Sequence, residues 1–440
     1  MTQTITHRRV LHIAMPIVLS NATVPILGAV DTGVIGQLGT AAPIGAVGVG
    51  AVVLTSVYWI FSFLRMGTTG LTGQAVGAGD RAEVAALLSR ALMIGATAGL
   101  ALIALQLPLF WAAFRVTPAS AEVESLARSY MALRIWSAPA AIALFGVTGW
   151  LIAQERTRAV LVIQLWMNGL NIALDMWFVL GLDWGIRGVA AATFLAEWSG
   201  LAMALWLVRG AFATPEWRDW ARVFDAARLR RMALVNIDIM IRSLALLATL
   251  TSFMLLGARF GDVTLAANQI LVQFLSITAY ALDGFAFAAE AIVGQALGRR
   301  NRAELRRGAL LTSGWGLAAV VLMSAAFWLW GGAIIDLMTT AEPVRAEARV
   351  YLPWMVASPL LGVAAWMLDG IFIGATRTRD MRNMMLLALL IYLAAVAALV
   401  PFFGNHGLWA AMMVSFLARA ATLWAKYPGL EREATGPRTA

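Results

Sequence analysis

The stretch GQAVGAGDRAE, residues 73–83, recurs later in the chain as GQALGRRNRAE, residues 294–304. Seven of the eleven positions are identical, whereas ordinary composition would give about one match. The same offset of 221 residues also places Gly149 on Gly370. One half of the chain therefore duplicates the other.

The composition around this repeat is that of a membrane protein. The 440 residues are 61% hydrophobic and 13% charged, and the mean hydropathy is +0.78. A soluble domain carries about 25% charged residues, and a membrane span needs about 20 apolar residues. The apolar runs predict twelve spans, at 11–38, 44–67, 88–112, 126–152, 158–181, 188–208, 232–258, 265–294, 308–331, 350–374, 383–403 and 407–425.

These features predict the fold class: an all-α integral membrane protein of twelve transmembrane helices in two six-helix repeated lobes. Six spans separate equivalent points, so we expect a pseudo-two-fold axis along the membrane normal. Two interpretations of the basic connection between the lobes stay open, a segment on the membrane surface and an ordinary linker. The predicted parts are an N-terminal lobe (1–210), a cytoplasmic linker (211–231), a C-terminal lobe (232–425) and a cytoplasmic tail (426–440).

The net charge of +9 follows from topology. Lys and Arg concentrate in alternate connections. The positive-inside rule then places both termini on the cytoplasmic side of a bacterial inner membrane. We therefore expect membrane lipid as a partner, no nucleic acid, and a monomer. The opposite connections hold only five basic residues, Arg115, Arg187, Arg259, Arg345 and Arg349.

Two other classes of protein lack the residues that they need. The chain has no cysteine and no HExxH motif, which argues against an intramembrane enzyme. Its one lysine is Lys426, so a lysine-containing phosphate loop is absent. We expect no enzyme and no cofactor, with energy from an ion gradient. A channel stays open as an alternative, although duplicated halves around intramembrane carboxylates favour alternating access.

Polar residues present in one half alone indicate a coupling site in the N-terminal lobe. Asn168, Asn171 and Asp175 are spaced by three and four, so they share one helix face. An intramembrane Asp costs about 2.5–3.5 kcal/mol on insertion scales and therefore needs a partner, a proton or water. Neutral packing carboxyls are the alternative. The residues with differing counterparts at the offset of 221 are Asp31 (Ser252), Asn171 (Tyr392) and Asp175 (Val396). Thr193 corresponds to Met412 when Gly188 is aligned with Gly407.

Further polar residues and a proline are secondary candidates. Pro25 predicts a bend in the first span, unless the helix simply tolerates it. Asp238 and Arg242 are four residues apart, which predicts a structural ion pair. The C-terminal half also carries intramembrane carboxylates whose role stays open, Asp283, Glu290 and Asp369.

Together these residues resemble the multidrug and toxic compound extrusion (MATE) family, in its DNA-damage-inducible F (DinF) branch. The resemblance covers nearly the whole chain, including both GQAxG loops and Asp31 within PILGAVDTGVIGQLG, residues 25–39. The most branch-specific stretch is NGLNIALDMWFVLGLDWGIRGVAAAT, residues 168–193. The resemblance implies antiport of cationic or amphipathic drugs against inward proton or sodium flow.

The resemblance also implies roles for particular residues. In similar proteins an Asp from helix 1 and an Asp from helix 5 form a hydrogen-bonded acidic centre with an Asn and a Thr. The matching residues here are Asp31, Asp175, Asn171 and Thr193. Such a cluster can hold a proton or offer oxygen ligands to sodium, so the coupling ion stays open. The alternative function is a lipid-linked oligosaccharide flippase of the same superfamily, which the acidic character of the site disfavours.

Overall fold

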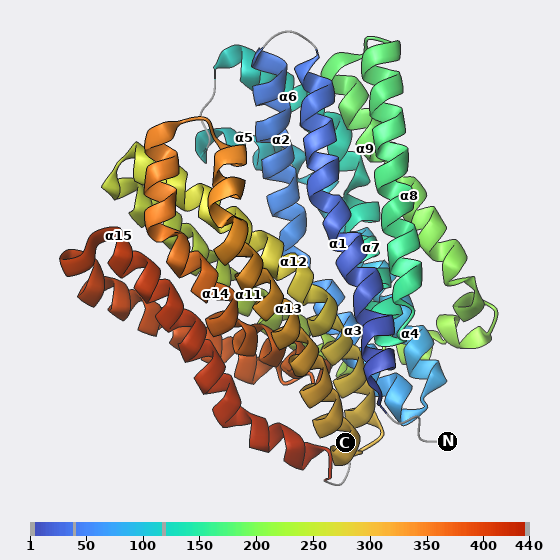
Figure 1. Cartoon of the computed structure of the whole chain (residues 1–440). Helices are drawn as coiled ribbons and strands as arrows, with labels where there is room; N and C mark the ends of the chain where they lie inside the picture. The colour runs from blue at the N-terminus through green and yellow to red at the C-terminus, as the bar shows by residue number, and fades with distance from the viewer. Residues whose placement is uncertain (1–4, 38–40, 117–119, 436–440) are drawn as a thin grey trace. The chain divides into compact units, whose positions relative to one another are not determined.

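The computed structural model describes residues 5–37, 41–116 and 120–435. Inside these ranges the side chains of six residues are outside the description, Ile26, Ala29, Asp31, Thr32, Ala41 and Val116. The regular elements in the described ranges are all helices (Figure 1). This follows from the apolar composition, because a helix satisfies its own backbone hydrogen bonds where lipid offers no partner.

The helices follow one another in the order of the predicted spans. Those of the first half are α1 (His7–Gly36), α2 (Ala41–Ile60), α3 (Phe63–Ala78), α4 (Arg81–Ala104), α5 (Gln106–Val116), α6 (Ala121–Arg134), α7 (Ala138–Ala153), α8 (Thr157–Asp175), α9 (Gly185–Leu207) and α10 (Trp220–Val223). Those of the second half are α11 (Ala226–Gly257), α12 (Asp262–Gly298), α13 (Arg302–Met338), α14 (Glu342–Gly374) and α15 (Thr378–Glu433). Short segments join some of them, η1 (Ile135–Ser137), η2 (Met176–Gly181), η3 (Arg209–Phe212), η4 (Pro215–Arg218) and η5 (Ala258–Phe260).

The predicted spans fall on these helices. Ten stretches among the described residues are long and apolar enough to cross a membrane. One of them, α15, contains two predicted spans, which meet at a kink where Gly404 has φ 54°. The first predicted span lies on α1 in addition to those ten. Twelve predicted segments therefore correspond to helices in the described part of the chain.

The chain forms two compact units. Unit 1 consists of Met1–Val18, Gly73–Gly79 and Arg231–Ala440. Unit 2 consists of Leu19–Thr72 and Asp80–Arg230. The first turns of α1 thus belong with the second half of the chain, because α12 approaches them closely. A Cβ atom on Gly284 of α12 would lie 2.7 Å from the carbonyl oxygen of Ala14.

Each unit has an apolar core of its own. The core of unit 2 includes Leu54, Met131 and Val189, which are at most 1% exposed. The core of unit 1 includes Phe253 and Trp409, whose rings pack edge to face with centroids 4.9 Å apart. Such aromatic pairs contribute about 0.5–1.5 kcal/mol beyond the burial of their area.

Glycines at equivalent positions of the repeat make equivalent helix contacts. A Cβ atom on Gly149 of α7 would collide with the carbonyl oxygen of Arg65 in unit 2. In unit 1, a Cβ atom on Gly370 of α14 would lie 2.6 Å from the carbonyl oxygen of Ala286. The two contacted residues, Arg65 and Ala286, are also 221 positions apart in the sequence. The duplicated glycines therefore keep the same close backbone packing in each half.

The two GQAxG motifs contact each other within unit 1. A Cβ atom on Gly77 would collide with the carbonyl oxygen of Gln295, and one on Gly298 would collide with that of Gln74. A Cβ atom on Gly73 would lie 3.4 Å from Cα of Gly294. Each copy of the motif therefore packs a glycine against the backbone of the other copy, and no larger residue fits at this contact.

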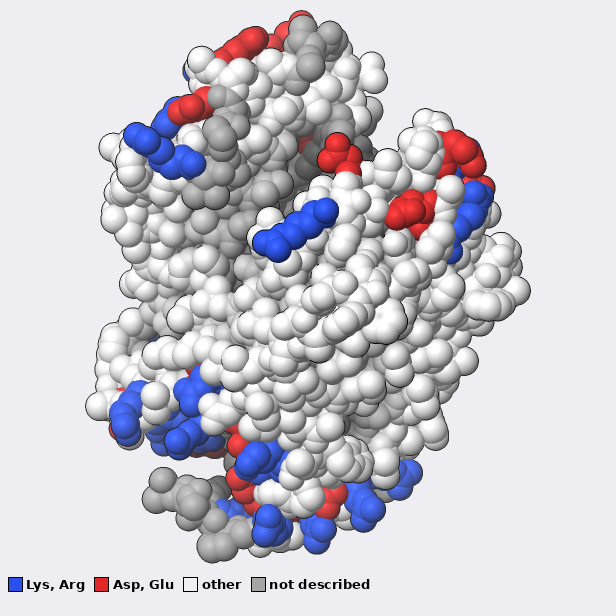
Figure 2. All heavy atoms as spheres, turned by 90° about the vertical axis from the view of Figure 1, so that its left-hand side faces the viewer, with Lys and Arg blue, Asp and Glu red and all other residues white. Residues whose placement is uncertain are grey.

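Charged side chains are unevenly distributed over the surface. On the face in Figure 2, charged side chains gather in separate groups with uncharged surface between them. Within unit 1, the start of α1 and the end of α15 lie at the same end (Figure 1), as an even number of spans requires.

Candidate functional site

The polar stripe predicted in the fifth span lies on α8. Asn168, Asn171 and Asp175 are 6%, 2% and 0% exposed. The helical spacing therefore places all three on a buried face, as predicted. Side chains as deeply buried as these need hydrogen-bond partners.

Most of these partners come from α8 itself. Nδ2 of Asn171 donates a hydrogen bond to Oδ2 of Asp175, one turn further on. Nδ2 of Asn168 donates to Oγ1 of Thr23 in α1 at 2.7 Å. Oδ1 of Asn168 accepts a hydrogen bond from Nε2 of Gln164 at 2.9 Å. The stripe thus extends to Gln164, which the same spacing could have revealed, and to Thr23, which nothing in the sequence pattern indicated.

The helix changes its geometry at Asp175. α8 ends at this residue, and the chain continues as the π-helix η2. Isolated π segments are rare and occur often at functional sites. Phe178 of η2 stacks on Trp184 with ring centroids 4.8 Å apart. A Cβ atom on Gly188 of α9 would lie 3.2 Å from Phe178, so glycine there lets the π segment pack closely.

Thr193 lies on α9, the helix that packs along α8. Its hydroxyl is half-buried and donates to the carbonyl of Val189 in its own helix at 3.1 Å. The backbone of Asp31 lies in α1, whereas its side chain lies outside the described residues. The meeting of Asp31 and Thr193 with Asp175 therefore stays a prediction. Helix α1 continues through Pro25, and its bend also stays a prediction.

The predicted sodium site depends on Asp31, whose side chain is not described. Among the described side chains, no three of His, Asp or Glu gather in a group that could hold a metal ion. Asn171 and Asp175 are adjacent, so their oxygens can bind a proton or contribute two ligands to a cation.

The candidate carboxylates of the second half lie in different surroundings. Glu290 is 1% exposed and Asp283 is half-buried, and both lie on α12. Asp369 of α14 is 6% exposed. Its Oδ2 accepts hydrogen bonds from Arg242 of α11 and Arg419 of α15. Asp369 is therefore the carboxylate of a three-helix ion cluster.

The predicted ion pair between Asp238 and Arg242 is wrong. Oδ1 of Asp238 pairs with Nη1 of Arg382 at 2.6 Å, and Oδ2 accepts from Thr378 at 3.1 Å. Arg242 pairs instead with Asp369. A spacing of four allows a pair along one helix. Here each charge is satisfied by a different neighbouring helix of unit 1.

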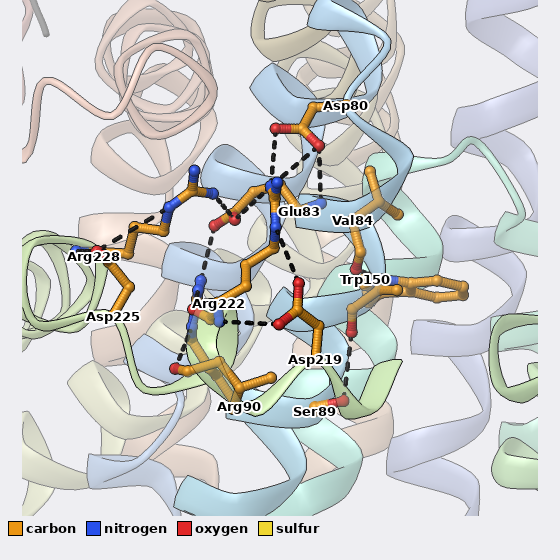
Figure 3. A network of polar contacts seen from close by, with 12 residues as sticks. Asp80, Glu83, Val84, Ser89, Arg90, Trp150, Asp219, Arg222, Asp225 and Arg228 are labelled. Carbon is orange, nitrogen blue, oxygen red and sulfur yellow. Dashed lines mark hydrogen bonds and ion pairs between the residues drawn. The ribbon is translucent and has the colours of Figure 1, made fainter. Parts of the chain in front are cut away.

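The linker between the halves docks on α4 through Arg90 (Figure 3). The Arg90 side chain is 1% exposed, and Nη1 pairs with Glu83 at 2.7 Å. Nε donates to the carbonyl of Val223 at 2.9 Å, and Nη2 donates to that of Arg222 at 2.5 Å. One buried guanidinium thereby holds the α10 turn against α4. Of the two interpretations of this linker, neither anticipated the docking.

Asp80 completes this junction outside the spans. Its Oδ1 accepts from the backbone N–H of Glu83 at 3.0 Å and caps α4. Nη1 of Arg222 lies 3.1 Å from its Oδ2. Partial burial alone would raise the pKa of Asp80. The backbone N–H of Glu83 and the Arg222 guanidinium outweigh that effect and lower the pKa below its usual range.

A repeated helical chain with apolar spans and a buried carboxylate defines the class of polytopic membrane proteins with an intramembrane polar site. Comparison with known protein families shows to which family of this class the chain belongs. The MatE family matches residues 16–205 and 239–399. The chain therefore belongs to the MatE family, and it is a multi-pass membrane transporter.

Individual relatives agree with this assignment. The chain is 38% identical to DNA damage-inducible protein F of Escherichia coli (strain K12), over 94% of this chain and 91% of that protein. It is 26% identical to the probable multidrug resistance protein NorM of Rhizobium meliloti (strain 1021), over 98% and 96% of the two chains. These relatives confirm the DinF-like resemblance.

Solved structures confirm the fold class. A MATE structure in the bent conformation superposes with a TM-score of 0.88 at 17% identity, covering 98% of this chain and 97% of that chain. An outward-facing MATE family transporter gives a TM-score of 0.82 at 18% identity, covering 97% of each chain. The predicted all-α, two-lobed membrane fold is therefore correct.

Proposed function

We propose that the chain is a secondary active multidrug efflux antiporter, which exports cationic or amphipathic organic compounds in exchange for protons or sodium. The observation that carries this proposal is the fully buried carboxylate of Asp175, hydrogen-bonded to Asn171 where α8 gives way to a π-helix. The name of the NorM relative, a probable multidrug resistance protein, supports the substrate class.

The chemistry of the stripe explains how an ion could be exchanged for a drug. A buried carboxylate is costly when ionised without a partner. A proton, a sodium ion or the positive charge of a drug can each supply that partner. Because the Asn171 amide already donates to one oxygen of Asp175, the carboxylate is held in one orientation. Binding of the ion and binding of the drug would then exclude each other at Asp175.

Asp31 and Thr193 belong to the same proposed centre. Their assignment rests on the family resemblance and on their absence from the second half of the repeat. Asn168 orients the stripe toward α1 through Thr23. We propose Asp31, Asn171, Asp175 and Thr193 as the ion- and substrate-binding residues, with no resident cofactor and no enzymatic step. The family match favours this function over the flippase alternative.

The proposal also covers the location of the protein, its orientation in the membrane and the number of chains that transport requires. We propose a location in the bacterial inner membrane with both termini in the cytoplasm, because basic residues concentrate in alternate connections. We also propose that one chain suffices for transport, because the repeat supplies two lobes that can alternate around one site. Cysteine substitutions suit a test of the orientation, since the natural chain has no cysteine.

Transport in proteoliposomes tests the function and identifies the ion. The purified chain would face a fluorescent organic cation under an imposed proton gradient, an imposed sodium gradient, or neither. We expect uptake against the cation's concentration gradient under one of the two ion gradients, and none without a gradient. Equal rates in all three conditions would contradict antiport.

The variant Asp31→Asn tests the proposed centre in the same assay. We expect gradient-driven transport to be lost while the protein elutes as a folded species. Ser252→Asn, at the equivalent position of the second half, is the control and should transport normally. Undiminished transport by Asp31→Asn would remove Asp31 from the centre without affecting the antiport proposal.

A further inference from the structure

The ion cluster of unit 1 is unusual because its charges do not balance. Arg242, Asp369 and Arg419 come from α11, α14 and α15 and are 7%, 6% and 4% exposed. Oδ2 of Asp369 accepts a hydrogen bond from each guanidinium. Two buried cations therefore share one buried anion, and the cluster carries one net positive charge.

No other acid compensates that charge among the described residues. Both arginines form ion pairs with Asp369, and no further ion pair to either of them is found in the described part of the chain. The Nε atoms of Arg242 and Arg419 are buried and have no hydrogen-bond partner there. A buried charge without compensation costs several kcal/mol, so the cluster retains both charge and donors for an additional ligand.

Two other arginines of the chain illustrate a balanced pair. Half-buried Arg382 pairs with Asp238 at 2.6 Å. Buried Arg134 pairs with Glu197 at 3.1 Å. These two pairs are neutral, whereas Arg242 and Arg419 share the single carboxylate of Asp369.

A small pocket adjoins the cluster. It is lined by α11 and α15, with Arg419 and the hydroxyl residues Thr249 and Ser415 beside apolar side chains such as Met412 and Phe416. The space suits a particle of about the size of one water molecule. An ion in this pocket would meet one cationic wall and be shielded from solvent, where an ion pair is stronger than in water.

The first half of the repeat carries no such cluster. The offset of 221 residues maps Arg242 to Asn21 and Asp369 to Thr148, and the alignment of Gly188 with Gly407 maps Arg419 to Gly200. All three counterparts are uncharged. By the same comparison that placed the acidic centre in the first half, a cationic centre belongs to the second half alone.

We propose that unit 1 contains a binding site for a small monovalent anion, with the Arg419 pocket as its seat, Arg419 as its ligand and Arg242 as the second cation of the cluster. The natural class of ligand is a halide ion. Bulkier organic anions are excluded because the pocket is small. The bound anion neutralises the cluster and stabilises the folded lobe, independently of any transported drug.

Thermal unfolding of the full-length purified protein tests this site. Tryptophan fluorescence would be followed in sodium gluconate, sodium chloride, sodium bromide and sodium formate at equal ionic strength and pH. A ligand that binds only the folded state raises the midpoint of unfolding. We expect the midpoint to rise by several degrees when a halide replaces gluconate. A rise with formate alone, or equal midpoints in all four salts, would refute the site.

The variant Arg419→Gln separates anion binding from a purely structural role. It leaves Arg242 and Asp369 as a neutral pair, so the halide response should vanish. Its midpoint in gluconate should equal or exceed that of the natural protein. Loss of stability in every salt would instead mean that Arg419 is a structural partner of Asp369, and would overturn the proposal. Arg382→Gln, which breaks a balanced pair, should keep the full halide response.

Anomalous scattering from bromide gives a second measurement, which needs no variant. Crystals of the natural protein grown with bromide should show a peak within hydrogen-bonding distance of the Arg419 guanidinium. Asp369→Asn raises the excess charge of the cluster, so its midpoint should depend more strongly on halide. A cluster without bromide, together with an unchanged halide response in Asp369→Asn, would contradict the site.

Discussion

At the scale of single residues, the buried pair of Asn171 and Asp175 distinguishes this chain from an ordinary helical bundle. The amide and the carboxylate lie one helical turn apart and bond to each other. Their counterparts, Tyr392 and Val396, carry no charge. The pair is therefore not required by the duplicated scaffold, and this makes a transport role testable by comparing the two halves.

Asp175→Asn should abolish ion-driven drug transport while leaving the fold intact. Asn keeps the size of Asp175 but cannot change its charge, so it cannot exchange an ion for a cation. The reciprocal substitution Val396→Asn introduces the same side chain at the equivalent position and should be mild. Uptake into proteoliposomes checks both variants, and equal damage from the two would show that any polar residue at these depths disturbs the protein.

Sequence reasoning recovered the α8 stripe because helical periodicity alone sets which residues share a face. It did not recover Thr23, because that contact joins residues 145 positions apart. It also chose the wrong partner for Asp238. A spacing of four makes the Arg242 pair possible, but Arg382 on another helix lies 2.6 Å away. Contacts between helices depend on their packing, which residue spacing does not determine.

At the scale of elements, the docked linker connects one half of the chain to the other. Arg90 donates two hydrogen bonds to it, to the carbonyls of Val223 and Arg222, and Ser89 donates to the carbonyl of Trp217 at 2.6 Å. Trp220 and Phe224 are about half exposed and stack on each other. The linker is therefore an ordered part of unit 2, and positive-inside counting could not have predicted this.

Arg90→Gln should release the linker from α4. The substitution removes the buried guanidinium that donates to the carbonyls of Val223 and Arg222, whereas Glu83 keeps its pairs with Arg228 and Arg222. We expect a limited protease to cut within residues 209–230 much faster than in the natural protein. Arg158→Gln removes an exposed arginine of the same unit and should leave cleavage unchanged. Equal protection of the two variants would show that the docking contributes little.

Asp80 should make the same junction sensitive to acid. Because folding lowers its pKa, its contribution to stability is present above its ordinary pKa and is lost as the pH falls through the lowered value. Asp80→Asn keeps the cap on α4 but loses the charge, so this acid-dependent loss should disappear. Asp80→Ala also removes the cap and should cost about 1 kcal/mol more. Proteolysis of the linker as a function of pH measures both effects.

At the scale of the whole molecule, duplication accounts for what could be predicted. The spans followed from apolar runs, because lipid requires long uncharged helices. The repeated motif gave the two-lobed plan. The π-helix after Asp175, the kink at Gly404 and the assignment of Met1–Val18 to unit 1 were not predictable. Each depends on packing between helices rather than on local pattern.

Gly77→Ala should destabilise unit 1. The new methyl group would collide with the carbonyl oxygen of Gln295, and overpacking typically lowers the free energy of unfolding by about 1–3 kcal/mol. Gly298→Ala should have a similar effect because its contact is the reciprocal one. Gly314→Ala, on an open face of α13, is the control and should be neutral or slightly stabilising. The midpoint of thermal unfolding compares the three; an unaffected Gly77→Ala would mean that the contact readily relaxes.

The central claim is that one chain couples drug movement to opposite ion flow through the acidic stripe of the first half. Its most direct test records both fluxes at once, in proteoliposomes that contain a pH or sodium indicator and a fluorescent organic cation. We expect that drug added on one side drives the ion in the opposite direction, toward the side on which the drug was added, with both signals lost in Asp175→Asn. Drug movement without any accompanying ion movement in the natural protein, or coupled fluxes that survive in Asp175→Asn, would contradict it.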